Sequence, residues 1–220
     1  MSKVSSRSVY HFSGVIVQNR MMQEFIKRCQ GAQILAILCN PPLKQSSLTT
    51  SWRNLQSLKE VLGAKEVLIS NIIEIPTRST EELRHLSGLL DHEELKTRIR
   101  SASGSADVTL AAWGAGAPAG WKKGHWAGMI NSALVGMIDS GHDGAIHVGT
   151  GTRHPSRWRQ YTSPIHQRYS GASFEDRLLE SLQWSSTDCQ WPRSSPRRRP
   201  VVLPAGGHGF SPVAASCFSP

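Results

Sequence analysis

Four short apolar runs divide the chain, and each is followed by a loop of small or polar residues. They lie at residues 34–39, 66–73, 107–112 and 145–148. The first run is continuously apolar from Ile34 to Leu38, without alternating polar positions. Such a run is typical of a strand that is covered on both faces, as in a parallel sheet. The pattern therefore predicts four buried strands.

Segments with helical periodicity separate these apolar runs. We expect helices at residues 21–29, 51–62, 81–89, 91–100, 121–140 and 174–184. In the second of them, which Ser51 caps, leucines recur at helical spacing up to Leu62, and Gly63 is placed to end the helix. Ser79 and Glu82 have the spacing of a capping box. Strands that alternate with helices predict an α/β fold, a three-layer α/β/α sandwich with a mostly parallel four-stranded central sheet.

The 220 residues divide into three parts by composition. Residues 1–29 form an N-terminal extension and helix, residues 30–184 form the α/β domain, and residues 185–220 form a tail rich in proline and arginine. The tail contains six of the chain's twelve prolines and has no apolar period. Because such a segment buries too little apolar surface to offset the entropy of ordering, we expect it to be disordered.

The formal net charge of the chain is +9 at pH 7, which favours acidic partners such as nucleotides, nucleic acid or an anionic surface. The tail arginines contribute part of this excess, and the rest belongs to the preceding residues. Cys29 and Cys39 lie in apolar surroundings and form no C-x-x-C pair, so we expect buried free thiols. With no secretory signal and no apolar run long enough to cross a bilayer, the sequence predicts a cytoplasmic protein that makes no membrane contact.

In parallel α/β sheets, ligands bind in the crevice beyond the carboxyl ends of the strands. All four loops lie at such ends, so we treat them as one candidate site. Its catalytic candidates are Asn40 and His154, and its ligand-binding candidates are Pro41, Asn71, Trp113, Gly114, Lys122, Arg153 and Trp158. No Walker A, G-x-G-x-x-G or G-x-S-x-G motif is present, and the histidines are too sparse for a metal site. We expect neither a metal nor a cofactor.

Each candidate has a functional and a structural interpretation, and the sequence leaves both open. Arg153 is suited to bind phosphate, or is a solvated loop residue. His154 can donate to a carbonyl or phosphate oxygen, or can bond to backbone and order its own loop. Asn40 can position a water or read a base edge, or can cap a tight turn, and Asn71 has the same alternatives. Trp113 can stack on a base, but is more often a core residue at a strand end.

Basic and aromatic residues also gather in the second half of the domain, a combination suited to single-stranded nucleic acid. The set consists of Lys122, Lys123, Arg157, Arg159 and Arg168 with Trp121, Trp126, Trp158 and Tyr161. The structural alternative is that these amphipathic side chains cover the domain edge. Residues 149–152, Gly-Thr-Gly-Thr, could cradle a phosphate through backbone N–H groups.

The strand-end motifs occur in a recognisable order. They are Asn40-Pro41 after the first strand, Asn71 after the second, Ala111-Ala112-Trp113-Gly114 after the third and Arg153-His154-Pro155 after the fourth. Over residues 34–158 this order and spacing resemble the domain-of-unknown-function 1643 family, which implies the fold more than an activity. Pro42 stands where that family usually has Ser, and Leu48-Thr49-Thr50 where it has Asp-Pro-Thr, so the acidic residue of the family pattern is missing.

A more distant similarity is to the uracil-DNA glycosylase superfamily, through residues 110–114 and His154-Pro155-Ser156. The catalytic Asp of that superfamily's first loop is absent, and Asn40 stands near its place. Some members of the superfamily use Asn there to hold a water. The similarity implies hydrolysis of a glycosidic bond, in which Asn40 orients water and His154 stabilises the departing base anion.

The leading hypothesis is a protein that binds a nucleotide or nucleic acid in the crevice, with single-stranded DNA favoured and glycosylase-like hydrolysis as its enzymatic form. In it, Arg153, His154 and Lys122 meet phosphate, and Trp113 or Trp158 stacks on a base. The alternative is a non-catalytic interaction protein that binds acidic partners through its basic surface and tail. Whether the chain is an enzyme, and its oligomeric state, stay open.

Overall fold

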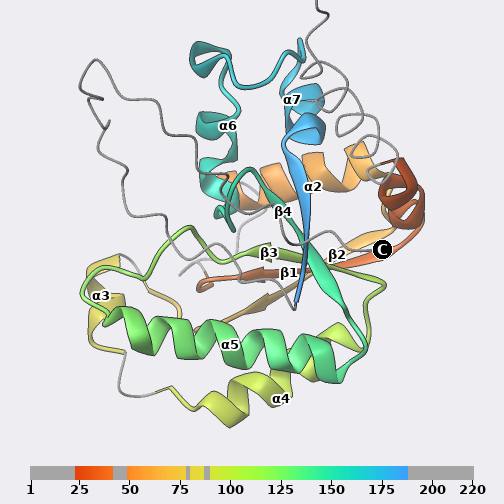
Figure 1. Ribbon diagram of the computed structural model, residues 1–220. Coiled ribbons are helices and arrows are strands. Elements are labelled where there is room, and N and C mark those ends of the chain that lie inside the picture. Colours follow the sequence, from red (N-terminus) through yellow and green to blue (C-terminus); the bar gives the residue numbers. More distant parts are fainter. Residues whose placement is uncertain (1–22, 42–48, 78–79, 87–89, 188–220) are drawn as a thin grey trace, which may run out of the picture.

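A five-stranded sheet forms the centre of the computed structural model, which describes residues 23–41, 49–77, 80–86 and 90–187 (Figure 1). Its strands are β1 (Gln33–Leu38), β2 (Glu66–Asn71), β3 (Val108–Ala112), β4 (Gly144–Val148) and β5 (Leu182–Ser186). Their order across the sheet is β2-β1-β3-β4-β5. The first four strands are parallel, and β5 runs antiparallel to β4. The sheet is therefore mostly parallel, with one strand more than the sequence predicts.

Helices cover both faces of this sheet. They are α2 (Thr50–Leu62), α3 (Thr80–Arg84), α4 (His92–Ser103), α5 (Lys123–Asp139), α6 (Trp158–Tyr161) and α7 (Phe174–Glu180), with the 3-10 helices η1 (Pro155–Arg157) and η2 (Pro164–His166), and residues 23–29 are also helical. Figure 1 shows α4 and α5 below the sheet and α2, α6 and α7 above it. Within the described ranges, none of these helices has the length and apolar character that a membrane span requires. The predicted three-layer α/β architecture is confirmed.

Two hydrophobic cores, one on each face of the sheet, explain why the first apolar run does not alternate. Ile34, Ala36 and Leu38 of β1 pack on the α2 side, whereas Leu35 and Ile37 pack on the α4–α5 side. All five side chains are at most 4% exposed. Burial of each large aliphatic side chain contributes roughly 1.5–3 kcal/mol relative to leaving it in water. A polar residue at any of these positions would therefore face a core.

The chain reverses its direction across the sheet at β1. It passes from β1 through α2 to β2 on one side, and then through α3 and α4 to β3 on the other side. Because crossovers between parallel strands are right-handed, opposite directions place their helices on opposite faces. The carboxyl ends of β1 and β3 therefore lie at the point of the sheet edge where proteins of this topology bind ligands.

The segment after α7 departs from the sequence-based expectation. Helical spacing predicts a helix through Trp184, but α7 ends at Glu180 and β5 follows. β5 pairs with the edge of β4, and its Ser185 hydroxyl lies 2.8 Å from His147 Nε2. Tertiary pairing overrides the local period here, so the sheet extends past the predicted end of the domain. The prediction of disorder from residue 185 is wrong for Ser185 and Ser186, which belong to β5. The remainder of that prediction falls on residues 188–220, which lie outside the described residues.

Other boundaries move by a few residues. α2 begins one residue earlier than predicted, because the Thr49 side chain rather than Ser51 caps it. Gly63 ends that helix in the left-handed conformation, as predicted. α3 ends at Arg84, short of its predicted end, and the predicted capping box falls on Ser79, outside the described residues.

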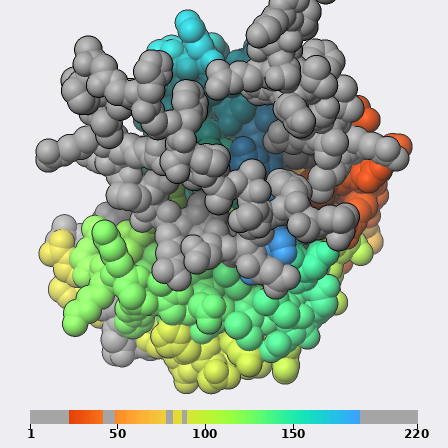
Figure 2. Space-filling model, in the orientation of Figure 1, coloured from red at the N-terminus to blue at the C-terminus, as the bar shows by residue number. Residues whose placement is uncertain are grey.

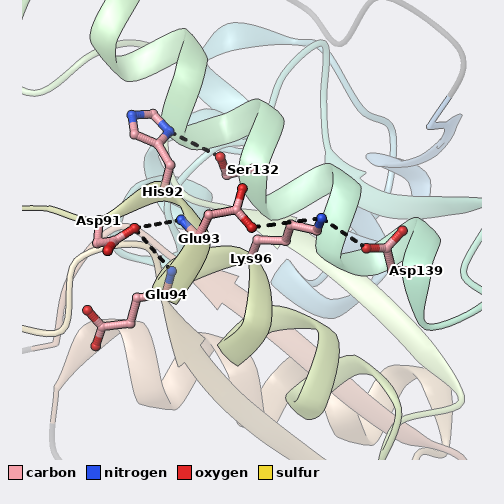
Figure 3. Close-up of polar contacts among 7 residues, drawn as sticks. All are labelled: Asp91, His92, Glu93, Glu94, Lys96, Ser132 and Asp139. Atoms are coloured by element: carbon pink, nitrogen blue, oxygen red, sulfur yellow. Dashed lines mark hydrogen bonds and ion pairs between the residues drawn. The ribbon is translucent and has the colours of Figure 1, made fainter.

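Polar contacts line the junction between α4 and α5 (Figure 3). Asp91 caps α4 by accepting the Glu93 N–H at 2.7 Å. Lys96 Nζ lies between Glu93 Oε2 at 4.0 Å and Asp139 Oδ2 of α5 at 3.5 Å. Ion pairs this exposed contribute about 0–1 kcal/mol. The two helices are therefore held together mainly by close packing. They form a continuous outer surface in the space-filling view (Figure 2).

Gly136 of α5 permits that close packing. A Cβ atom here would lie 2.6 Å from the Lys96 carbonyl oxygen and 3.1 Å from the Arg100 backbone nitrogen. We expect Gly136→Ala to push the helices apart and to lower the free energy of unfolding by about 1–3 kcal/mol, measured by urea denaturation. The control is Gly124→Ala in the first turn of α5, where a Cβ meets no atom within 4 Å and stability should not fall. Equal stability of the two variants would contradict the conclusion that Gly136 permits the close packing of α4 and α5.

Candidate functional site

Two hydrogen bonds join the loops that follow β3 and β4. The Gly114 N–H donates to the Thr152 carbonyl oxygen at 2.5 Å, and the Thr152 hydroxyl donates to the Gly114 carbonyl oxygen at 2.7 Å. Gly114 has a φ of 107°, a conformation that side chains other than glycine rarely adopt. The pair places Gly114 beside the segment that carries Arg153 and His154.

Tyr161 of α6 lies on the turn that begins the loop after β4. Gly149 has a φ of 69°, and a Cβ atom there would lie 2.3 Å from Tyr161 Cε1. The backbone of Thr150, the next residue, is bonded to the Tyr161 hydroxyl. Glycine thus permits both the turn and the contact with the ring. The sequence predicts that residues 149–152 could bind a phosphate. In the structure, the first two of these residues contact Tyr161.

Two arginines lie against the Tyr161 ring. The guanidinium carbon of Arg153 is 3.8 Å from the ring centroid, and that of Arg168 is 4.7 Å from it. Arg168 Nη1 also donates to the Tyr161 carbonyl oxygen at 2.9 Å. Such cation–π contacts contribute about 0.5–1 kcal/mol at exposed sites and more when desolvated. We call Arg153, Tyr161 and Arg168 the Tyr161 stack, and it holds two cations at the carboxyl end of β4.

The carboxylates of the neighbouring helix α7 are bound to other groups. Glu175 accepts the Ser57 hydroxyl at 3.2 Å, and Glu180 accepts the Ser170 N–H at 2.8 Å. In the part of the chain that the structure describes, neither arginine of the Tyr161 stack forms an ion pair. Arg153 Nε is buried and has no hydrogen-bond partner among these residues. The stack therefore presents positive charge that the described residues do not neutralise.

Tyr169 adds a hydroxyl to this cluster and donates it to the Tyr161 hydroxyl oxygen at 3.3 Å. Burial favours the neutral form of Tyr161, but the Tyr169 hydroxyl, the Thr150 backbone and the Arg153 charge together hold its pKa below the ordinary value. Burial raises the pKa of Tyr169, and the bond to Tyr161 raises it further. Tyr169 is thus the donor of the pair and Tyr161 the acceptor.

His154 is half-buried and caps η1. Its Nδ1 accepts the Ser156 N–H at 3.4 Å and lies 3.0 Å from the Ser156 hydroxyl oxygen. Burial lowers its pKa to about 4, and the Arg157 charge acts in the same direction. The imidazole is therefore neutral at pH 7 and carries its proton on Nε2. His154 orders its own loop, as the structural interpretation predicts, and its Nε2–H remains a donor.

The other half of the carboxyl edge carries Asn40 and Pro41, which follow β1, and Asn71, which is the last residue of β2. Asn40 Nδ2 donates to the Thr77 hydroxyl at 2.9 Å and to the Pro41 carbonyl oxygen at 3.2 Å, which ties the two loops together. Its Oδ1 is then the atom that can accept from a water or ligand. The Asn71 carbonyl oxygen accepts from Arg98, whereas its buried Oδ1 has no partner among the described residues.

The structure does not place Trp113 or Trp158 where a base could stack on it. Trp113 is 4% exposed and packs in the core on the α4–α5 side. Trp158 is fully buried in the opposite core, and its Nε1–H donates to the Arg153 carbonyl oxygen at 2.8 Å. Large rings gain most when they leave water completely, and the indole N–H then needs a partner. Trp158 therefore holds the backbone of Arg153 in place.

The basic and aromatic set of the sequence also separates in three dimensions. Trp121 and Trp126 are buried, and Trp121 Nε1 donates to the Leu83 carbonyl oxygen of α3 at 2.5 Å. Lys122 follows Trp121 and is exposed at the start of α5. It therefore lies on the α3 side of the crevice, whereas Arg153 lies beyond β4.

Sequence reasoning missed the Tyr161 stack as a unit. It groups Tyr161 and Arg168 with other basic and aromatic residues, but treats Arg153 as a separate candidate and does not consider Tyr169. The density of arginine and tyrosine between residues 153 and 169 was the available signal. Spacing did not reveal the arrangement, because η1, α6 and η2 change the chain direction within a few residues and so have no common period.

Two hollows of the described structure lie elsewhere. One of about 230 Å³ is at the amino ends of β3 and β4, lined by Asp107, His142 and Asp143 among others. The other is an open groove along β2 and α4 that includes Leu68 and Arg98. Neither contains a residue of the Tyr161 stack, so neither belongs to the candidate site. Within the described ranges, no three or more His, Cys, Asp or Glu side chains are grouped to hold a metal ion.

The two cysteines within the described residues are free thiols. Burial raises the pKa of both Cys29 and Cys39 to about 12. Both thiols therefore stay protonated at pH 7 and are poor nucleophiles. Cys29 is buried as predicted, whereas Cys39 is only partly buried. Cys189 and Cys217 lie outside the described residues.

No protein-family model matches this chain, and neither a curated protein nor a solved structure matches it. The similarities to the domain-of-unknown-function 1643 family and to the uracil-DNA glycosylase superfamily therefore stay predictions. The chemistry of the site is inferred from the geometry of its own residues.

The surroundings of His154 predict an unusual titration. Its folded pKa of about 4 lies below the value of about 6.5 that an unfolded histidine has. The contribution of His154 to stability should therefore be complete above about pH 6.5 and lost as the pH falls towards 4. Long-range ¹H–¹⁵N spectra, assigned with His154→Ala, should show an unprotonated Nδ1 at pH 7 and a midpoint near 4. A midpoint near 6.5, or a proton on Nδ1, would refute this picture.

Proposed function

We propose that the chain binds a nucleotide or a nucleic acid at the carboxyl ends of β3 and β4. The observation that carries this proposal is the guanidinium of Arg153, which is oriented by the Tyr161 ring and forms no ion pair within the described residues. An oriented, unneutralised guanidinium suits phosphate, because its N–H groups match a pair of phosphate oxygens. The net charge of +9 favours the approach of such an anion.

Other groups of the crevice would contact the rest of this ligand. His154 is neutral at pH 7, so its Nε2–H suits the carbonyl oxygen of a base better than a charged pair with phosphate. Asn40 contributes Oδ1 as an acceptor from the β1 side. In this proposal Arg153 holds phosphate, while His154 and Asn40 meet the base or a water.

The contacts in this proposal are polar and ionic, because the Trp113 and Trp158 rings are buried. Base stacking on tryptophan is therefore not part of it. Single-stranded DNA remains the best first probe, since it exposes phosphates and base edges together. Affinity that rests on phosphate contacts falls as the salt concentration rises, because binding releases counterions.

Removal of Arg153 tests the proposal directly. We expect Arg153→Ala to weaken binding of a labelled single-stranded DNA about tenfold or more, because a charge-assisted hydrogen bond to phosphate is lost. Fluorescence anisotropy of the full chain at two salt concentrations measures the effect. Arg100→Ala, which removes an exposed cation from α4, is the matched control and should change affinity by less than about twofold.

The same titrations separate the proposal from a non-catalytic interaction protein that binds acidic partners through its tail. For this comparison Arg197, Arg198 and Arg199 are replaced together by glutamine. Binding that survives this replacement and fails in Arg153→Ala supports the crevice. Binding that disappears with the tail arginines, and is unaffected by Arg153→Ala, would assign the charge effect to the tail.

A second candidate function, glycosylase-like hydrolysis, is favoured by the protonation state of His154. A neutral imidazole that donates Nε2–H can stabilise the anion of a departing base. Asn40 Oδ1 can orient the attacking water. We infer this activity from these two groups alone.

Release of a free base is the measurement for this candidate. If hydrolysis occurs, single-stranded DNA with modified bases should yield free base on chromatography, and His154→Ala should slow the release about 10²–10³-fold. Asn40→Ala should also abolish it, with Arg100→Ala as the unaffected control. Absence of release from every modified DNA tested would leave a binding protein without this activity.

A further inference from the structure

The two arginines of the Tyr161 stack suggest a more specific ligand. We propose that Arg153 and Arg168 together receive a terminal phosphate, that is, a phosphate monoester at the end of a nucleotide or an oligonucleotide. This inference rests on the nucleotide-binding function proposed above. It adds the chemical class of the phosphate and assigns a role to Arg168.

The charge of the stack matches a monoester better than an internal diester. Two guanidinium groups lie 3.8 and 4.7 Å from one ring centroid, and neither is paired with a carboxylate within the described residues. An internal phosphodiester carries one negative charge, whereas a monoester carries about 1.5–2 at pH 7 because its second pKa is near 6. A monoester can therefore neutralise both arginines, and a single diester can neutralise only one.

The number of free oxygens favours the same ligand. Arg153 is held by the ring and by the Trp158 bond to its carbonyl oxygen, and Arg168 is held by its bond to the Tyr161 carbonyl oxygen. The two guanidinium groups thus offer donors from two separate chain segments. A monoester has three terminal oxygens to accept from both, whereas a diester has two and is constrained by the chain on either side.

The two arginines of the Tyr161 stack are more exposed than its ring. Gly149 contacts the Tyr161 ring, which is 9% exposed. Arg168 is exposed, and Arg153 is half-buried. A ligand would therefore meet the guanidinium groups, while the Tyr161 ring supports both of them. Tyr161 is a positioning residue in this arrangement.

Paired oligonucleotides test the proposal with the full chain. One pair of single-stranded DNAs has the same sequence and a 3′ label, and differs only in a 5′-phosphate or a 5′-hydroxyl. A second pair carries a 5′ label and differs in the same way at the 3′ end. At pH 7.5 we expect the phosphorylated member of at least one pair to bind about tenfold more tightly. The pair with the larger difference identifies the preferred end.

Variants of Arg168 assign this preference to the stack. Arg168→Gln should reduce the preference, that is, the ratio of the affinities for the phosphorylated and hydroxyl ends, to less than about twofold, because the second cation is lost. Arg168→Lys keeps the charge and should retain part of the preference. If Arg168→Gln does not fold, this variant tests the role of Arg168, because an unchanged preference in Arg168→Lys would contradict it. Arg100→Gln on α4 is the control and should keep the full preference. Thermal unfolding of each variant checks the fold.

The pH dependence gives an independent readout. Between about pH 7.5 and 5 the monoester loses its second charge, whereas arginine does not titrate. The neutral state of His154 persists over most of this range, since its pKa is about 4. The preference for the phosphorylated end should therefore decline as the pH falls. A purely structural role of the stack would give no such decline.

The outcomes separate this inference from the function on which it rests. Equal binding of phosphorylated and hydroxyl ends, with loss of both in Arg153→Ala, overturns the terminal-phosphate proposal and supports nucleic-acid binding in the crevice. A preference that persists in Arg168→Gln also overturns the terminal-phosphate proposal, because a group other than Arg168 would then bind the terminal phosphate. Failure of every DNA and of a labelled nucleoside 5′-monophosphate to bind overturns both proposals.

Discussion

The burial of β1 on both faces is the constraint on which the rest of the structure depends. A strand whose alternate side chains enter two different cores needs helices above and below it. The chain meets this need by going to β2 on one side of β1 and to β3 on the other, with right-handed crossovers that place α2 and the α4–α5 pair on opposite faces. The same reversal separates the loops after β1 and β3, so the requirement for two cores also creates the edge at which the polar loops gather.

At that edge, the competition between burial and hydration determines which side chains are available to a ligand. Trp113 and Trp158 gain most by leaving water, and both lie in the cores. Arginine can rest its guanidinium on a ring and still keep its charge near solvent, which is the arrangement of Arg153 and Arg168 on Tyr161. The loops after β3 and β4 therefore offer cations and hydrogen-bond donors in place of the stacking rings that the composition of the sequence favours.

Two neighbouring residues of the loop after β4, Arg153 and His154, differ in charge. Burial lowers the pKa of His154 to about 4, and the nearby Arg157 charge acts in the same direction. At physiological pH His154 is therefore neutral and has an Nε2–H donor, next to the guanidinium of Arg153. In the function proposed above, these two adjacent residues contact two parts of the ligand, an anionic group and an uncharged oxygen. The Gly114–Thr152 hydrogen bonds and the Trp158 bond to Arg153 hold the loop that carries them.

The sequence by itself determined the α/β class, the four parallel strands, the helix end at Gly63 and the gathering of polar loops at the carboxyl edge. These features depend on local periodicity, turn chemistry and the handedness of crossovers, all of which act over short stretches of chain. Only the tertiary structure decided that residues 182–186 form β5, because a strand this short has no distinct period and needs the edge of β4 to pair with. It also decided that Trp158 turns into the core while Arg168 reaches the Tyr161 ring. Such choices depend on which surfaces from distant segments meet, and spacing along the chain does not encode that directly.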